Sequence, residues 1–405
     1  EGVVSQLQRG HLADLFDPRQ VLTEVSGAGN NWAHGHAVYG PQLREGFLEC
    51  VRHAASSCDS LQCFQLVHSL GGGTGSGLGT YLLSALEDEY PKQYRFATAV
   101  FPAADDDVIT SPYNAALSAA ELVRHADVVL PVDNGALASL VERAERPLPS
   151  DQLRAACVTD NGVGGSAIGG VSASGRPPPR AFDGMNNLVA HMLTNLTASV
   201  RFDGNLNVDL SDLTSSLVPY PRMHFLLPAI APLYSLRDLK YRSSRLEGLF
   251  TDAFAPHSQL MRADPRRTTL LACGLLIRGD VTMSDVQRNL IRLRPSLRLP
   301  YWNPDGVKVG LCAASPVGQP HSLLSLANSC ATADVIGGLL ARFDRLYRRR
   351  AHLHHFTQYV EASTLADARE TLDSTRGAYE QARGLTPPPE AAQLLERLVP
   401  TMHAL

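Results

Sequence analysis

The pattern of apolar and polar positions over roughly the first third of the chain predicts strands that alternate with helices. The stretches 63–70, 96–101 and 127–132 have the composition of buried strands, and helical spacing precedes the second and third of them. Helical spacing also follows the first stretch, at 78–87. This alternation favours an α/β fold with a mostly parallel sheet, whose ligands bind at the carboxyl ends of the strands.

The middle of the chain has a mixed pattern. Helical spacing at 182–200 predicts a central helix, and three strand candidates follow it at 223–227, 270–276 and 307–312. We therefore expect a second, α+β region after the central helix.

The last part of the chain is predicted to be helical. A helix at 335–347 with a continuation to 359 is expected, followed by a second helix at 364–384 that three prolines at 387–389 bring to an end. Within the first of these helices, Arg345, Arg348, Arg349 and Arg350 form a basic run. Because no aromatic residues are interleaved with it, a solvated or protein-binding face is favoured over a nucleic-acid site.

Composition narrows the function classes. The 405 residues carry a formal net charge of −4, which gives no electrostatic case for binding nucleic acid or a membrane surface. The seven cysteines include no CxxC pair, as expected for free thiols in a reducing, cytoplasmic compartment. No apolar stretch approaches the length of a membrane span. His352, His354 and His355 lack the i, i+4 spacing of a helical metal site, so no metal is expected there.

A glycine-rich run between the first strand and its helix is the strongest chemical signal. A strand, a glycine loop and a helix N-terminus together present backbone N–H groups to an anion, which predicts a phosphate site. Leu78 follows the run where a P-loop has lysine, and the dinucleotide pattern G-x-G-x-x-G fits no register of 71–79. A surface turn without a ligand is the less favoured alternative. The run consists of Gly71, Gly72, Gly73, Thr74, Gly75, Ser76 and Gly77.

These seven residues match the signature of the tubulin superfamily, and the resemblance extends over nearly the whole chain. Further segments resemble tubulin loops and helices in the family's order, namely 26–33, 112–114, 133–134, 186–188, 207–212, 217–222 and 343–354. Within the family the chain looks most like the epsilon type. The segments that favour this branch are 61–64, 106–114 and 351–355, together with an insertion at 142–181.

The resemblance implies a domain organisation. The segments expected by analogy are a partial GTP-binding domain at 1–181 with a glycine- and proline-rich insert at 142–181, a central helix at 182–201, an intermediate domain at 202–335 and a C-terminal helical domain at 336–405. We expect the insert to be a tolerated surface loop, with partner binding as the alternative. By the same resemblance, a first strand and two nucleotide loops would precede Glu1.

The resemblance also implies a set of nucleotide contacts for GTP or GDP. The run 71–77 and the residues Ala28, Gly29 and Asn30 would hold the phosphates. Ribose and base would contact Asn114, Asn134 and Asn186, and Phe182 would stack on guanine. Alpha and beta tubulins carry a glutamate for the ribose where this chain has Ser111, so either Asp107 compensates or the ribose is held more loosely. Mg²⁺ is expected with the nucleotide, through acids that would precede Glu1.

Asp209 and Asp212 are the catalytic candidates. In tubulins this loop meets the nucleotide of the next subunit, and its acids orient the attacking water. Spacing i, i+3 at a helix start places both carboxylates on one face, although capping that helix is an equally physical role. Asp212 is one methylene shorter than the glutamate of alpha tubulin. A slow GTPase acting on a neighbouring subunit is therefore the expectation.

The expected partners are other tubulins, of the alpha/beta or delta type, and centriolar proteins. The resemblance to the epsilon type implies the centriole or basal body as the place of action. The C-terminal sequence is not acidic like the tails of alpha and beta tubulins, and the region 234–250 is unlike theirs, so the bulk microtubule lattice is not the expected destination. The alternative from another class is a structural adaptor in which nucleotide is a folding cofactor or is absent.

Overall fold

The computed structural model describes residues 2–10, 13–24, 26–103, 106–145, 182–204, 206–233 and 246–383. The predictions for most of the insert at 142–181, for 234–245 and for the end of the chain from 384 fall outside the described residues.

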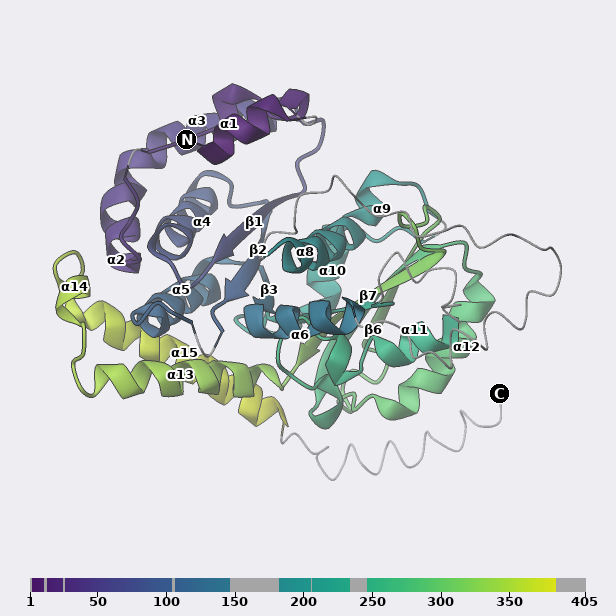
Figure 1. Ribbon diagram of the computed structural model, residues 1–405. Coiled ribbons are helices and arrows are strands. Elements are labelled where there is room, and N and C mark those ends of the chain that lie inside the picture. The colour runs from purple at the N-terminus through teal and green to yellow at the C-terminus, as the bar shows by residue number, and fades with distance from the viewer. Residues whose placement is uncertain are drawn as a thin grey trace, which may run out of the picture.

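A three-stranded parallel sheet forms the first layer, as the alternating pattern predicts (Figure 1). Its strands β1 (Cys63–Ser69), β2 (Tyr94–Phe101) and β3 (Val128–Asp133) lie in that order. The crossover helices are α4 (Gly79–Glu89) and α5 (Ser111–His125). Five of the six β3 residues are buried, which explains why its sequence is a nearly continuous apolar run.

The N-terminal segment lies along one side of this layer. It consists of α1 (Gly2–Arg9), a helix that changes from α2 (Trp32–His34) through a π-helical turn (Gly35–Tyr39) into α3 (Gly40–Ser56), and the short 3₁₀ turns Ala13–Leu15 and Pro18–Gln20. In Figure 1 this purple segment runs past the edge of the sheet formed by β1, and α3 packs on α4.

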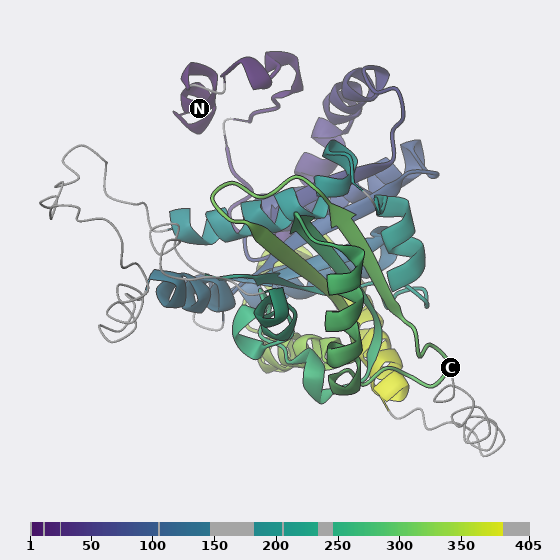
Figure 2. The same ribbon diagram turned by 90° about the vertical axis from the view of Figure 1, so that its right-hand side faces the viewer.

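A second, mixed sheet has the order β4-β7-β5-β6 (Figure 2, green strands facing the viewer). Its strands are β4 (Leu226–Ala231), β5 (Leu270–Gly279), β6 (Val307–Cys312) and β7 (His321–Ser329). Strands β5 and β6 are parallel, and the other two pairs are antiparallel. The surrounding helices are α10 (Leu210–Leu217), α11 (Leu246–Asp252) and α12 (Met283–Leu293), with 3₁₀ turns at Pro256–Ser258, Pro265–Arg267 and Arg294–Ser296.

One strand prediction in this region needs correction, and one strand was missed. The strand expected at 223–227 begins only at Leu226, and the central strand β7 was not predicted at all. Serine and asparagine interrupt the apolar pattern of β7, yet they are buried. Asn328 is fully buried, and its polar side chain is tolerated there because its amide donates hydrogen bonds to the carbonyls of Leu217 (2.8 Å) and Met223 (2.7 Å). Satisfied polar groups can occupy a core, and periodicity does not reveal them.

The central helix is interrupted near its end. Helix α8 (Asp183–Leu196) stops before Thr197, and the short α9 (Ala198–Arg201) follows. Helix α8 packs on α6 (Asn134–Glu145) and also contacts strands of the second sheet. It therefore connects the first layer to the second sheet along the chain, while the domain boundaries stay a prediction.

The C-terminal helices cover α5 (Figure 1). They are α13 (Thr332–Tyr347), the short α14 (His354–Thr357) and α15 (Ala362–Arg383). The predicted continuation of α13 to residue 359 is wrong, because the helix ends at Tyr347. Arg350 and His352 then adopt left-handed φ values of 50° and 56°, which a continuous helix does not allow.

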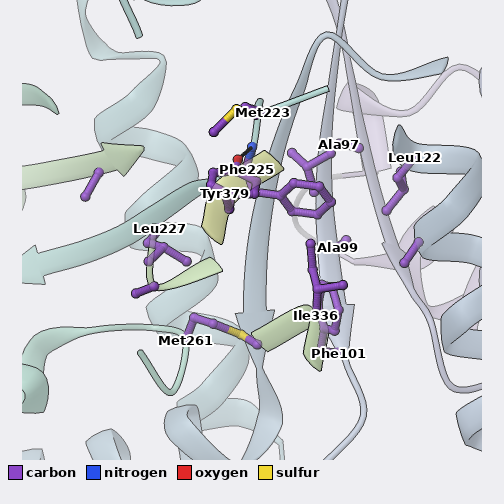
Figure 3. Packing of buried hydrophobic residues seen from close by; sticks show 14 of the residues in the cluster. Ala97, Ala99, Phe101, Leu122, Met223, Phe225, Leu227, Met261, Ile336 and Tyr379 are labelled. Atoms are coloured by element: carbon purple, nitrogen blue, oxygen red, sulfur yellow. Dashed lines mark hydrogen bonds between the residues drawn. The ribbon is translucent and has the colours of Figure 1, made fainter. Parts of the chain in front are cut away.

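A shared core joins these layers. Figure 3 shows Tyr379 of α15 beside Phe225 and near Ala97 of β2. The Tyr379 hydroxyl accepts a hydrogen bond from the backbone N–H of Phe225 at 3.2 Å, and both side chains are buried. Val129 of β3 pairs with Phe225 in an isolated parallel bridge. The C-terminal helices and both sheets are thereby fixed to one another.

Candidate functional site

The candidate site lies at the carboxyl ends of the parallel strands. Gly71 and Gly72 follow β1 after a single residue, Asp106 lies in the connection after β2, and Asn134 begins α6 after β3. Residues 28–31 pack against the glycine-rich run from the side. We call residues 28–31 and 71–74 together the cradle.

Asn114 holds the two walls of the cradle together. Its amide nitrogen donates to the carbonyls of Asn30 and Gly71, each at 2.8 Å, and its Oδ1 accepts from the backbone N–H of Trp32 at 2.9 Å. The side chain is fully buried. This geometry corrects the sequence prediction: Asn114 positions the cradle, and its amide is not available to touch ribose or base.

The first wall has an unusual backbone. Gly29 and Asn30 both have positive φ, at 58° and 53°. Glycine adopts this region without strain, and asparagine tolerates it better than most residues. The Thr110 hydroxyl adds a hydrogen bond to the Asn30 carbonyl at 3.2 Å. Gly29 and Asn30 are exposed, whereas Ala28 is buried, so its side chain serves packing.

The glycines of the second wall fall into two groups. A β-carbon on Gly73 would lie 2.6 Å from the Asn31 nitrogen, and one on Gly75 would lie 2.8 Å from the Ser69 carbonyl oxygen. A β-carbon on Gly77 would likewise collide with the Trp32 carbonyl. These three glycines are required because other backbone segments of the same chain pack directly against them.

Gly71 and Gly72 form the other group. A β-carbon on Gly72 would meet nothing closer than Asn30 Oδ1 at 3.7 Å, and Gly72 is only partly buried. A β-carbon on Gly71 would lie 3.1 Å from a carboxylate oxygen of Asp106. The space beside Gly72 is therefore open to a ligand, and the space beside Gly71 is bordered by the Asp106 side chain.

The predicted glycine loop is shorter than the sequence indicates. No residue from 71 to 77 has positive φ, and Thr74–Leu78 already forms a π-helical turn that leads into α4. Ser76 is fully buried and donates to the carbonyl of Gly72, so its side chain stabilises this turn. Thr74 is exposed beside the cradle. The backbone from Gly71 to Thr74 thus remains as the phosphate candidate.

Asp106 is a site residue that sequence reasoning missed. Its carboxylate accepts a hydrogen bond from Ser111 Oγ at 2.8 Å and also borders Gly71. Asp107, which was the candidate to compensate for Ser111, is exposed, and its side chain has no hydrogen bond within the described ranges. Three consecutive aspartates at 105–107 were the available signal, but only the fold shows which of them contacts Ser111.

Asn31 was also missed. Its Oδ1 accepts from the Ala33 N–H at 2.9 Å, so it is the N-cap of α2, and its amide nitrogen donates to the His355 carbonyl at 2.7 Å. The second bond ties the cradle to the C-terminal helices. An asparagine just before a helix is a recognisable capping signal.

The remaining predicted contacts lie on α6 and α8. Asn134 is half-buried at the start of α6. Phe182 precedes α8 and is 59% exposed, and Asn186 is exposed one turn later. The two helices pack closely, since a β-carbon on Gly184 would lie 2.8 Å from Val141. The three residues are thus accessible, and their contact with a base stays a prediction.

Asp209 and Asp212 lie at the start of α10, and both are exposed. Asp209 occupies the N-cap position, but its side chain makes no capping hydrogen bond. Neither carboxylate has a side-chain partner in the described part of the chain. Leu210, Leu213 and Leu217 anchor the helix in the core. Both acids are therefore held by a fixed helix and remain free to act outside it.

The two candidate sites are at opposite ends of the first sheet. The C-terminal half of α10 shares a cavity with Arg95 at the start of β2 and with Asp127, just before β3. The eight residues of β2 separate that end from the cradle, a length of about 23 Å at the usual rise per residue. The C-terminal half of α10 therefore lies near the end of the sheet that is farther from the cradle.

A charged network fixes this opposite end. The Arg95 side chain is only 8% exposed and lies 3.2 Å from an Asp127 oxygen. The His125 ring lies between Glu87 at 2.5 Å and Glu121 at 3.2 Å. Hydrogen bonds that its ring donates to Glu121 and Glu87 raise the pKa of His125 despite partial burial. Each basic side chain of this network is paired with a carboxylate of the same chain, so we assign the network a structural role.

Comparison with known proteins identifies both the region of the first sheet and the region of the second sheet. Residues 1–142 match the model of the tubulin/FtsZ family GTPase domain, and residues 221–340 match that of the tubulin C-terminal domain. The chain therefore belongs to the tubulin family, and with that it is a tubulin-type GTP-binding protein.

Individual relatives resolve the branch. The chain is 47% identical to the tubulin epsilon chain of Mus musculus over 94% of this chain and 79% of that protein. It is 46% identical to the tubulin epsilon chain of Homo sapiens over 94% and 80%. Identity to the tubulin alpha-1 chain of Saccharomyces cerevisiae is 34%, over 93% and 80%. The predicted resemblance to the epsilon type is confirmed.

Proposed function

We propose that the cradle holds the phosphates of GTP or GDP. The observation that carries this proposal is the contrast between adjacent glycines: Gly73 is required by packing, whereas Gly72 is flanked by open space beside Asn30. Asn114 fixes the spacing between the two walls. Backbone amides in such a strand–loop–helix arrangement favour an anion.

The other contacts are proposed in the same frame. Asp106, placed by Ser111, would accept a hydrogen bond from a ribose hydroxyl, and Asn134, Phe182 and Asn186 would contact the base. The four segments with limits at 181, 201 and 335 would be its domains. For Mg²⁺, the described residues include no cluster of three ligating side chains. In this proposal a magnesium ion enters with the nucleotide, and phosphate oxygens and water would supply ligands to it.

We further propose that Asp209 and Asp212 act on the nucleotide of a neighbouring subunit. Phosphoryl transfer requires mainly positioning and charge stabilisation, so a carboxylate that orients water is sufficient. Both carboxylates are exposed and unpaired within the described ranges, and the C-terminal half of α10 lies near the end of the sheet that is farther from the cradle. A head-to-tail assembly brings one chain's α10 to the next chain's cradle.

At the cellular level we propose an epsilon-type tubulin of the cytoskeleton that contributes to compound microtubules of centrioles or basal bodies, with alpha/beta or delta tubulins and centriolar proteins as partners. The similarity to the epsilon chains supports this role. The second candidate, a structural adaptor that does not hydrolyse nucleotide, is favoured by one observation: Asp212 has a shorter side chain than a glutamate.

Two measurements test the proposal. Titration calorimetry should show GTP binding and no comparable binding of ATP, and a folded protein that binds neither contradicts the cradle assignment. In a complex assembled with partner tubulins, Asp212→Asn should lower GTP turnover while Asp280→Asn, at an exposed acid after β5, leaves it unchanged. Equal turnover in both variants favours the adaptor.

A further inference from the structure

A surface groove runs between α13 and α15, away from the cradle and from α10. It has a volume of about 530 Å³. Figure 1 shows the two helices side by side at the edge of the molecule, next to α5, on which both of them pack. The charged residues that line the groove are Asp344, Arg345, Arg348, Arg369, Asp373 and Arg376.

The groove carries an excess of positive charge. Four arginines and two aspartates line it, and both aspartates are already engaged. Asp344 accepts two hydrogen bonds from Arg369, at 2.7 and 3.0 Å, and Asp373 lies 2.9 Å from Arg376. These pairs position the guanidinium groups without using all of their five N–H donors.

Arg345 of α13 and Arg348, just after the helix, are left for an outside ligand. Arg345 has no ion pair or side-chain hydrogen bond within the described residues, and it is exposed. Arg348 is 80% exposed and only 3.6 Å from Asp344, whose stronger partner is Arg369. Arg349 and Arg350 extend the positive surface beyond the groove. In a chain with a net charge of −4, this is a local reversal of sign.

The lining distinguishes between anionic partners. It contains no aromatic residue, so bases of a single-stranded nucleic acid would find no stacking surface. Asp344 and Asp373 would also repel a continuous phosphate backbone. A peptide differs, because its carboxylates can take bidentate arginine contacts while its backbone N–H groups face the aspartates. Arg369 and Arg376 are seven residues apart, which spaces such contacts by about 10 Å along the helix.

We propose that this groove binds an acidic, aspartate- or glutamate-rich segment of a partner protein. Arg345 and Arg348 contribute the free charge, and Arg369 and Arg376 present donors held in place by the aspartates. The site needs no nucleotide and lies on the C-terminal helices, so it can recruit a partner independently of assembly through the cradle.

The test is direct binding of a fluorescently labelled poly-glutamate peptide, followed by anisotropy. The double variant Arg345→Glu/Arg348→Glu should weaken binding at least about tenfold, because two favourable pairs become repulsive. Raised salt should weaken binding to the unaltered protein. The matched control is Arg44→Glu/Arg143→Glu on α3 and α6, which changes the net charge equally and should bind almost as tightly as the unaltered protein.

Circular dichroism and retained GTP binding establish that each variant is folded. The proposal fails if poly-glutamate does not bind, or if both double variants lose binding equally, which would show a non-specific charge effect. It also fails if an oligonucleotide binds more tightly than poly-glutamate and loses that binding only in the α13 variant. The groove would then be a nucleic-acid site.

Discussion

Alanine substitutions at the adjacent glycines 72 and 73 separate packing from ligand binding. In the structure a β-carbon on Gly73 would lie 2.6 Å from the Asn31 nitrogen and 2.8 Å from the Ala28 carbonyl oxygen. Those two atoms form a hydrogen bond of 3.0 Å that closes the first wall. A β-carbon on Gly72 would have its nearest neighbour at 3.7 Å.

The expected magnitudes follow from these distances. Ordinary contact begins near 3.4 Å, so in Gly73→Ala the backbone at Asn31 must retreat by about 0.8 Å; overpacking of this kind costs roughly 1–3 kcal/mol. Gly72→Ala should change the free energy of unfolding without nucleotide by less than about 0.5 kcal/mol. Its methyl group would instead displace a phosphate from a backbone donor, a loss of about 1.5 kcal/mol or roughly tenfold in affinity.

Urea unfolding with and without GTP distinguishes the two effects. At a GTP concentration about one hundred times the dissociation constant, the unaltered protein should gain about 2.7 kcal/mol, and Gly72→Ala about 1.4 kcal/mol. Gly73→Ala should lose a similar free energy under both conditions. If Gly73→Ala were as stable as the unaltered protein, or if Gly72→Ala gained as much from GTP, the division of the glycines would be refuted.

Three further predictions concern buried polar groups. Asn114→Leu removes three hydrogen bonds from buried partners and should lower the free energy of urea unfolding by about 3–5 kcal/mol. The control Asn134→Ala should cost less than about 1 kcal/mol, and equal costs would contradict the role of Asn114 in holding the cradle together. Complete burial lowers the pKa of His224 from 6.5 to about 4, and its Nε2 has no partner within the described residues. Because the folded state disfavours the charged ring, the free energy of unfolding is highest above pH 6.5 as far as His224 is concerned. It falls as the pH drops towards 4, by up to about 3 kcal/mol. His224→Gln should flatten that part of the pH–stability curve, and an unchanged slope would count against the assignment. Tyr379→Phe leaves the buried N–H of Phe225 unpaired and should lower stability by about 1–2 kcal/mol, and a neutral result in thermal or urea unfolding would contradict that role.

The second and third strands of the first sheet were predictable because they are largely buried and mostly apolar, whereas β1, which also has the composition of a buried strand, is only partly buried in the structure. The position of the glycine-rich run after β1 also followed from local pattern alone. By contrast, β7 escaped prediction since Asn328 and its serines look polar in sequence and are satisfied only by distant partners. The end of α13 was missed because Arg350 and His352 give no sign of a left-handed backbone.

The site was predictable in place but not in detail. The roles of Gly72 and Gly73 depend on contacts with residues 28–31, which lie about forty positions earlier in the chain. Asn114 was predicted to contact the ligand because its amide suits a ribose. In the fold, this amide instead makes three hydrogen bonds to backbone groups of the protein itself. Which of the neighbouring aspartates meets Ser111 likewise depends on the turn into α5.

The nucleotide content of the purified, folded protein tests the central claim most directly. Denaturing the protein and separating the released nucleotides by chromatography should give about one GTP or GDP per chain, with less from Gly72→Ala than from the unaltered protein. A well-folded protein that releases no nucleotide, or releases adenine nucleotide in place of guanine, would contradict the assignment of the cradle as a GTP site.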